Sequence, residues 1–233
     1  RSGNLLNVAC NDDSDFGAGI YQSQVQFAPS VGTTYYIEVA DWGSPPGNQL
    51  VLNVSSALVP QEMTFYSDAV YDGDTWESGE DTSRGGDAYA GAPTAAVGDD
   101  MLDLQHRVIL HFDTEDLPDN AVVTGVTLRI KKVMIQGTNP FTTHGFLKVD
   151  MKTGAFHELL ALEKFDFHAV GSRGNVGRFI RVMDDGWYRA PLRAVSYPLV
   201  NLKGTTQFRL RFYLPYNNAD EADYLRLYSG NAV

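Results

Sequence analysis

Acidic side chains gather in one stretch of the chain that reads as a loop, and their spacing could bind a hard cation. The stretch covers 68–81, and its carboxylates include those of Asp68, Asp72, Asp74, Glu77 and Asp81. Calcium takes six to eight oxygen ligands, which come from carboxylates and from loop carbonyl groups. A bound ion would also offset the repulsion between neighbouring like charges. These residues therefore predict a calcium site, and the alternative is a solvated acidic surface.

Two smaller groups of acidic residues have the same chemistry. Asp12 and Asp13 lie in the run Asn-Asp-Asp-Ser-Asp, and we include both among the predicted calcium ligands. Asp99, Asp100 and Asp103 form a third group. The spacing of an EF-hand is absent from all three, so the sequence predicts oxygen ligands without predicting their arrangement.

Three aromatic residues stand where they could meet a ligand. Trp76 lies within the acidic stretch, and Trp187 and Tyr188 follow an Asp-Asp-Gly turn. Aromatic faces suit the C–H-rich faces of sugar rings, so we predict these three as a carbohydrate platform. Consecutive residues of a strand point to opposite faces, which places one of Trp187 and Tyr188 in the core. For each aromatic the alternative is ordinary core packing.

The sequence contains no pattern that predicts catalysis. We find no Gly-x-Ser-x-Gly elbow, no His-Glu-x-x-His, no phosphate-binding loop and no dinucleotide fingerprint. His106 and His111 are five positions apart in a strand-like run, which puts them on opposite faces. Asp166 and His168 would share a strand face and could form an acid–base pair, or simply a hydrogen bond. We predict a protein that is not an enzyme and has no catalytic residues.

Alternation of apolar and polar residues predicts strands along most of the chain. It is clearest at Phe208, Leu210 and Phe212, and it also marks 25–27, 35–39, 50–54, 108–112, 126–130, 146–151 and 178–182. The one helix candidate is 156–164. We therefore expect an all-β protein with two jelly-roll-like β-sandwich modules in tandem. The first, at 1–54, would be incomplete, 55–61 would be a linker, and the second would cover 62–233.

Charge excludes some classes of partner. The chain of 233 residues has a formal charge of −11, and no apolar run approaches the roughly 20 residues of a membrane helix. We therefore expect neither nucleic-acid binding nor membrane insertion. Residues 1–106 hold 16 acidic and two basic residues, leaving 13 acidic and 16 basic residues for 107–233. This asymmetry could favour head-to-tail contacts between copies of the chain.

The first part of the chain resembles a known family. The segment 5–13 and the run Gly-Thr-Thr-Tyr-Tyr-Ile-Glu-Val at 32–39 are similar to the second half of the bacterial pre-peptidase C-terminal domain. That family is a small β-sandwich appended to exported enzymes and related to calcium-dependent collagen-binding modules. The family's first strands have no counterpart in this sequence.

The second part resembles disaggregatase-related carbohydrate-binding β-sandwiches of secreted bacterial proteins. The matching segments are 107–113, 117–121, 126–130, 206–212 and 224–231, which are mainly core strands. In that family a further strand follows the Ser-Gly-Asn turn that ends near Asn231, so this module could lack its last strand. Both ends of the chain thus look cut inside a module, as in a piece of a longer protein.

Together these observations predict a secreted or cell-surface pair of binding modules stabilised by calcium. The expected partner is a polysaccharide or a cell-surface glycan, with self-association through open strand edges. Two alternatives stay open. One is a structural subunit of an extracellular filament or surface assembly held by strand exchange, and the other is the accessory C-terminal region of an exported hydrolase.

Overall fold

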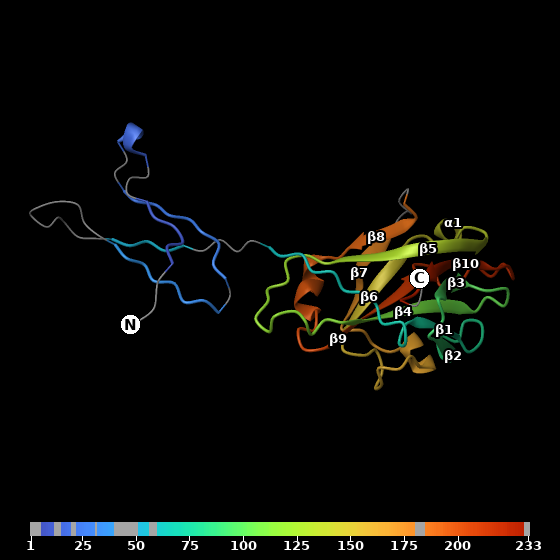
Figure 1. Ribbon diagram of the computed structural model, residues 1–233. Coiled ribbons are helices and arrows are strands. Elements are labelled where there is room, and N and C mark those ends of the chain that lie inside the picture. The colour runs from blue at the N-terminus through green and yellow to red at the C-terminus, as the bar shows by residue number, and fades with distance from the viewer. Residues whose placement is uncertain are drawn as a thin grey trace, which may run out of the picture. The chain divides into compact units, whose positions relative to one another are not determined.

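The chain divides into two units, Arg1–Ala57 and Leu58–Val233. A computed structural model describes residues 6–11, 15–19, 22–30, 32–39, 51–55, 60–179 and 185–230 (Figure 1). The division lies inside the stretch 55–61 that the sequence indicates as a linker.

The first unit has little regular structure where the structure describes it. Its one regular element there is the short 3₁₀ helix η1 (Phe16–Ala18). The described residues of the runs 25–27, 35–39 and 50–54, expected as strands, belong to no strand. Many of their apolar side chains are exposed, including those of Ile37 and Val54. The described residues of this unit therefore do not confirm a sandwich module.

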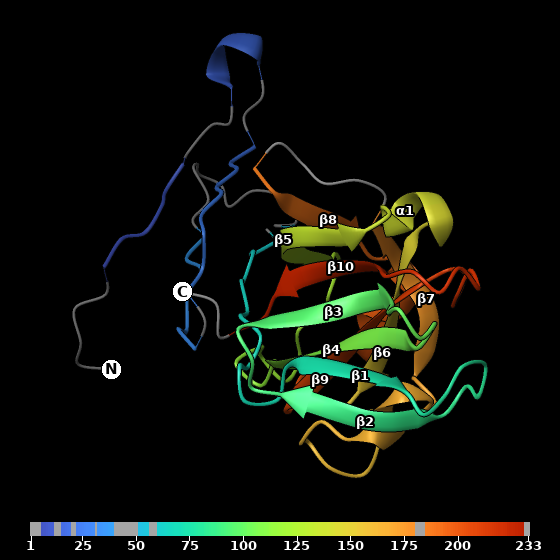
Figure 2. The same cartoon turned by 90° about the vertical axis from the view of Figure 1, so that its right-hand side faces the viewer.

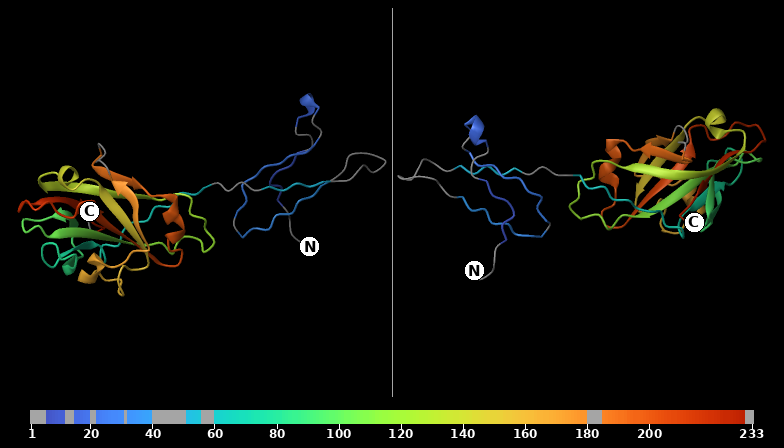
Figure 3. Two further views of the ribbon diagram at one scale, coloured as in Figure 1. Left: turned by 180° about the vertical axis from the view of Figure 1, so that it is seen from behind. Right: turned by 45° about the horizontal axis from the view of Figure 1, so that its top comes forward.

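The second unit is an all-β domain, as predicted. Its described residues form ten antiparallel strands: β1 (Gly73–Glu77), β2 (Gly85–Ala90), β3 (Thr94–Asp99), β4 (Gln105–Asp113), β5 (Thr127–Gly137), β6 (Leu147–Thr153), β7 (Arg173–Phe179), β8 (Trp187–Pro191), β9 (Thr205–Phe212) and β10 (Asp223–Tyr228). Helical turns are few and lie in the connections, as Figure 3 shows: α1 (Pro140–Thr143), η2 (Lys164–Phe167) and η3 (Ala194–Leu199). No helix in the described parts of the chain is long and apolar enough to cross a membrane.

Strand β4 joins the two layers of this domain. The strand order is β7-β6-β9-β4-β3-β10-β5-β8, and β1 pairs with β4 and with β2. The start of β4 pairs with β3, whereas Val108–Asp113 pairs with β9. Figure 2 looks onto the layer of β3, β10, β5 and β8, and the layer of β9, β6 and β7 lies behind it. Arg193, just after β8, donates its backbone N–H to Val176 of β7, so the sheet is nearly closed.

The core lies between these layers. Inward positions that alternate along the strands are buried, as at Leu225 and Leu227 of β10 and at Phe208 and Leu210 of β9. The period of two that marks 208–212 in the sequence is therefore a true strand signal, with one face covered by apolar neighbours.

The helix predicted over 156–164 is absent. The stretch holds bends, and only the short 3₁₀ turn η2 begins at its last residue, Lys164. Phe156 is buried and its backbone N–H donates to Oε1 of Gln207 (2.8 Å), whereas Leu159 and Leu160 stay exposed. The apolar residues that would share one helix face thus have different environments, which removes the reason for a helix.

Candidate functional site

The described residues enclose an open hollow of about 360 Å³ on the second unit. Its walls come from β1, β2, β3, β10 and the start of β4. Three aromatic side chains line it, those of Trp76, Tyr89 and Tyr224, together with charged side chains. The sequence singles out Trp76, and the hollow brings it together with residues that lie far away in the chain.

Strand register explains why these side chains share one face. Directly opposed residues of antiparallel strands point to the same side. Trp76 lies opposite His106, and Tyr224 lies opposite Gly98. On β1 the neighbouring position of the same face is Asp74, which lies opposite Tyr89. Pairing alone therefore gathers the aromatic and charged residues of four strands around one hollow.

Asp74 connects two strands that have no ladder between them in the described part of the chain. Its Oδ1 accepts the backbone N–H of Ala96 on β3 (3.1 Å), and its Oδ2 lies 3.0 Å from Nδ1 of His106. Only 8% of Asp74 is exposed. The carboxylate thus satisfies a backbone group that would otherwise lack a partner where the layers diverge.

His106 is held between two carboxylates. Its Nε2 lies 3.4 Å from Oδ2 of Asp100, on the side opposite to Asp74. Burial lowers the pKa of His106, but hydrogen bonds and charge from Asp100 and Asp74 outweigh this and raise the pKa to about 9. The imidazole is therefore charged at neutral pH, and both ring nitrogens are donors.

The aromatic rings flank this charged centre. The ring of Trp76 stacks on His106 with centroids 5.6 Å apart and an interplanar angle of 26°, and Tyr224 lies 6.4 Å from the same imidazole. Arg226 lies over Tyr224, 5.6 Å from the ring centroid, and donates to Oγ1 of Thr94 (3.2 Å). The hollow therefore combines apolar ring faces with donors and acceptors at short range.

The other two predicted platform residues separate, as consecutive strand positions should. Tyr188 is 2% exposed, stacks on Phe141 in the core, and burial raises its pKa to about 12. Trp187 faces away from the core, with the guanidinium of Arg129 5.1 Å from its ring centroid. Trp187 lies on β8, at the far edge of the layer that contains β3 and β10, and is not part of the hollow.

Among the described residues, no three of the acidic side chains predicted to bind calcium place ligand atoms within 4.8 Å of one another. Asp72 is fully buried and accepts backbone N–H groups of His111 (2.8 Å) and Gly230 (2.9 Å), and burial raises its pKa to about 6. Asp68 accepts the N–H of Val70 (2.9 Å).

The structure describes three of the other predicted ligands. Glu77 is buried and accepts the N–H of Ser83, Asp81 is in a left-handed turn conformation with φ 57°, and Asp74 lines the hollow. Asp12 and Asp13 lie outside the described residues. Within the described ranges, the acidic residues of the stretch 68–81 thus serve mainly as acceptors for backbone groups.

The proposed acid–base pair of Asp166 and His168 does not form. Both residues belong to η2 and its C-cap rather than to a strand. Asp166 accepts the N–H of Glu163 (2.8 Å) in a capping box, and Nδ1 of His168 lies 3.4 Å from the N–H of Gly85. The strand alternation that suggested the pair is therefore wrong at this point.

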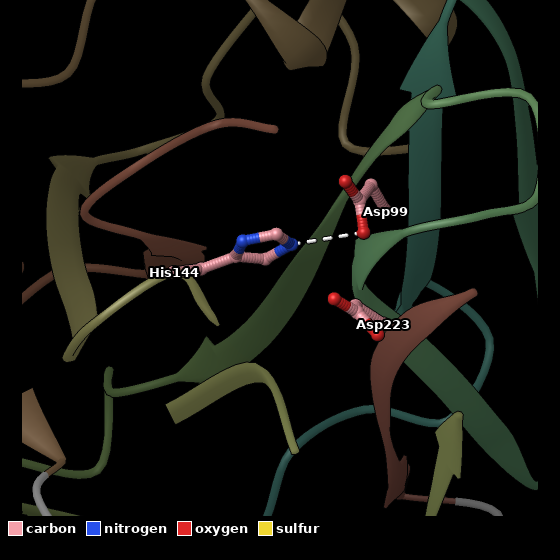
Figure 4. A group of neighbouring side chains, drawn as sticks. All are labelled: Asp99, His144 and Asp223. Atoms are coloured by element: carbon pink, nitrogen blue, oxygen red, sulfur yellow. Dashed lines mark hydrogen bonds and ion pairs between the residues drawn. The ribbon is translucent and has the colours of Figure 1, made fainter. Parts of the chain in front are cut away.

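One buried cluster combines a histidine with two carboxylates, and the sequence points to only one of its three residues. Asp99, His144 and Asp223 place ligand atoms within 4.8 Å of one another, the one such group of three among the described residues (Figure 4). Nε2 of His144 lies 2.8 Å from Oδ1 of Asp99. Asp99 belongs to the third acidic group of the sequence, whereas no local signal marks His144 or Asp223.

Comparisons with known proteins do not identify a family for this chain. No protein-family model matches the chain, and no curated protein matches it.

Proposed function

We propose that the second unit is a non-catalytic carbohydrate-binding module and that the hollow holds part of a polysaccharide or a cell-surface glycan. The observation that carries this proposal is the stacked pair of Trp76 and His106 in an open hollow. An indole ring that lines a hollow among charged groups suits a sugar ring, which presents C–H groups on one face and hydroxyl groups at its edge.

The remaining polar groups of the hollow complete the requirements of a sugar. Hydroxyl groups need both donors and acceptors, because burying one without a partner is costly. Asp100 is partly exposed and offers carboxylate oxygens, and the guanidinium of Arg226 offers several N–H donors. Tyr89, 61% exposed at the rim, provides a further ring face.

The protonation states in the hollow favour binding over hydrolysis. A glycoside hydrolase needs one carboxyl group that stays protonated near neutral pH. Burial raises the pKa of Asp100, but its hydrogen bonds with His106 and with backbone N–H groups of Leu102 and Leu104 outweigh burial and lower that pKa. Asp100 is thus a poor general acid, which supports a non-catalytic role.

Affinity electrophoresis of the full chain through gels with neutral and acidic polysaccharides tests the proposal. At least one polysaccharide should retard the wild type, and Trp76→Ala should weaken that binding by about tenfold or more, the effect of losing roughly 1.5 kcal/mol of stacking. Tyr89→Ala should weaken it less, because Tyr89 lies at the rim. Tyr66→Ala is the matched control, since Tyr66 is 86% exposed and outside the hollow. Equal retardation of wild type and Trp76→Ala on every polysaccharide would contradict the proposal.

A further inference from the structure

We propose that Asp99, His144 and Asp223 form a buried site for one divalent transition-metal ion, with Zn²⁺ as the representative ion. The site is separate from the hollow and does not depend on its proposed function. Each ligand comes from a different element: Asp99 ends β3, Asp223 begins β10, and His144 is the C-cap of α1 (Figure 4). Asp99 and Asp223 lie directly opposite each other in the β3–β10 ladder.

The polar atoms of this cluster are buried and incompletely paired. Asp99 and His144 are fully buried, and Asp223 is 1% exposed. Oδ2 of Asp99 and Nδ1 of His144 have no hydrogen-bond partner. A buried polar atom without a partner is costly, and most such atoms in folded proteins are paired. An ion at the centre of the cluster would give Asp99 the partner that the protein does not supply.

The number of acidic groups in the cluster also favours a bound cation. Asp103 is 2% exposed, and its Oδ1 has no hydrogen-bond partner. It lies close enough to Asp99 to interact with it electrostatically, as Asp223 and His144 also do. Three buried carboxyl groups thus gather around a single imidazole, so acidic groups outnumber basic ones in the cluster. Uncompensated buried charge is strongly unfavourable, and a divalent cation would balance it.

The ligand types select the class of metal. An imidazole nitrogen with carboxylate oxygens suits Zn²⁺ and similar first-row ions, whereas calcium prefers an all-oxygen shell of six to eight ligands. The carboxylate of Asp223 is oriented by two further bonds, from the backbone N–H of Thr138 (3.0 Å) and from Nδ2 of Asn217 (2.7 Å). Such outer hydrogen bonds hold a ligand in position in metal sites. Full burial makes the role structural: the ion would tie α1 to β3 and β10.

Calorimetric titration of the full chain, stripped with a chelator and then supplied with Zn²⁺, tests the site. We expect one equivalent of Zn²⁺ per chain and a higher melting temperature, because an ion bound only to the folded state stabilises it. Ca²⁺ at the same concentration should not reproduce the shift. Asp99→Asn keeps the shape but removes the charge, and should bind Zn²⁺ about 100-fold more weakly or worse.

Controls separate this site from adventitious binding. His144→Gln should lose the equivalent of Zn²⁺, while His157→Gln should keep it, because His157 is a partly exposed histidine on another loop, paired with Glu163 (3.2 Å). Should Asp99→Asn or His144→Gln fail to fold, the wild-type titration still decides. Absence of stoichiometric Zn²⁺ binding to the folded wild type would overturn the proposal, as would unchanged binding in folded Asp99→Asn.

Discussion

His106 and Asp74 form a partly buried ion pair in which Nδ1 lies 3.0 Å from Oδ2, and the other oxygen of Asp74 accepts the N–H of Ala96. One carboxylate therefore joins β1, β3 and β4 where the two layers separate. This link also fixes the imidazole beside Trp76. The charged imidazole of His106 thus helps to hold these strands together and also lines the hollow.

Stability of the second unit should fall in mild alkali because of this pair. The pKa of His106 rises from 6.5 to about 9 on folding, so its contribution is complete below pH 6.5 and disappears as the pH rises through 9. Its neighbours in the hollow are the carboxylates of Asp74 and Asp100, the ring of Tyr224 and the guanidinium of Arg226. We expect the free energy of unfolding to drop by about 1–3 kcal/mol over that range.

Urea unfolding of His106→Gln supplies the comparison. This variant should lack the alkaline drop between pH 6.5 and 9 while keeping any drop caused by other groups. An NMR titration of the wild-type imidazole should give a pKa well above 6.5, and in Asp74→Asn that pKa should fall. An imidazole pKa at or below 6.5 in the wild type would contradict the charged pair.

Truncation of the two adjacent aromatic residues on β8 should lower stability by very different amounts. Tyr188→Ala removes a core ring that stacks on Phe141, and should cost about 3–5 kcal/mol of unfolding free energy. Trp187→Ala removes an outward ring that contacts Arg129, and should cost much less. Chemical denaturation measures both, and a larger loss for Trp187→Ala would show that the side chains face the other way.

Asp150 should be far more important for stability than an exposed acid in a similar pair. It is 1% exposed and accepts from Nε of Arg211 (2.7 Å) and Nη2 of Arg209 (3.2 Å). Asp150→Asn leaves the buried guanidinium of Arg209 uncompensated, so we expect a loss of about 3–5 kcal/mol. The control is Asp185→Asn, whose partner Arg189 is exposed, and whose loss should be small.

Acid should also weaken the Asp150 cluster. Burial raises the pKa of Asp150, but Arg211 and its other partners outweigh burial and lower it. The stabilisation is therefore present above the pKa of an unfolded aspartate and is lost as the pH falls through the lower folded value. Unfolding curves of the wild type and Asp150→Asn should converge in acid, and parallel curves would contradict this assignment.

Gly98 should not tolerate a side chain. Its φ is 136°, and a Cβ atom would lie 2.2 Å from the carbonyl oxygen of Asp223 on the paired strand β10. Gly98→Ala should therefore force β3 from β10 and lower stability by about 1–3 kcal/mol or more. Gly125→Ala is the matched control, because nothing lies within 4 Å of its Cβ position. A Gly98→Ala protein as stable as Gly125→Ala would refute this.

Period-two patterns predicted the core strands of the second unit because each has one apolar face that packs into the core. The pattern is clear at Phe208, Leu210 and Phe212, which all lie in the core. Alternation also predicted that the side chains of Trp187 and Tyr188 would face opposite sides of their strand. The same rule failed at Asp166 and His168, where a capping box makes a 3₁₀ turn. Short alternating runs cannot distinguish these two structures.

Contacts between distant segments could not be read from the sequence. The partner of Asp74 on β3 is a backbone N–H 22 residues away, which leaves no mark in residue type. His144 lies 45 residues after Asp99 in the sequence and contacts it from the end of the short helix α1. The calcium site of the acidic stretch 68–81 stays a prediction, because buried carboxylates that accept backbone N–H groups, as Asp72 does, have the same composition as a calcium loop. The secreted location stays a prediction of the sequence.

The most direct test of the proposal that the hollow binds a glycan is an amide NMR titration of the full chain with a polysaccharide fragment that retards it in gels. The largest shifts should fall on Trp76, including its indole N–H, and on Ala96 and Arg226 on neighbouring strands. Lys148 and Asp150 on β6, in the other layer, should stay unchanged. Shifts that concentrate on β6 and leave Trp76 unmoved would contradict the account.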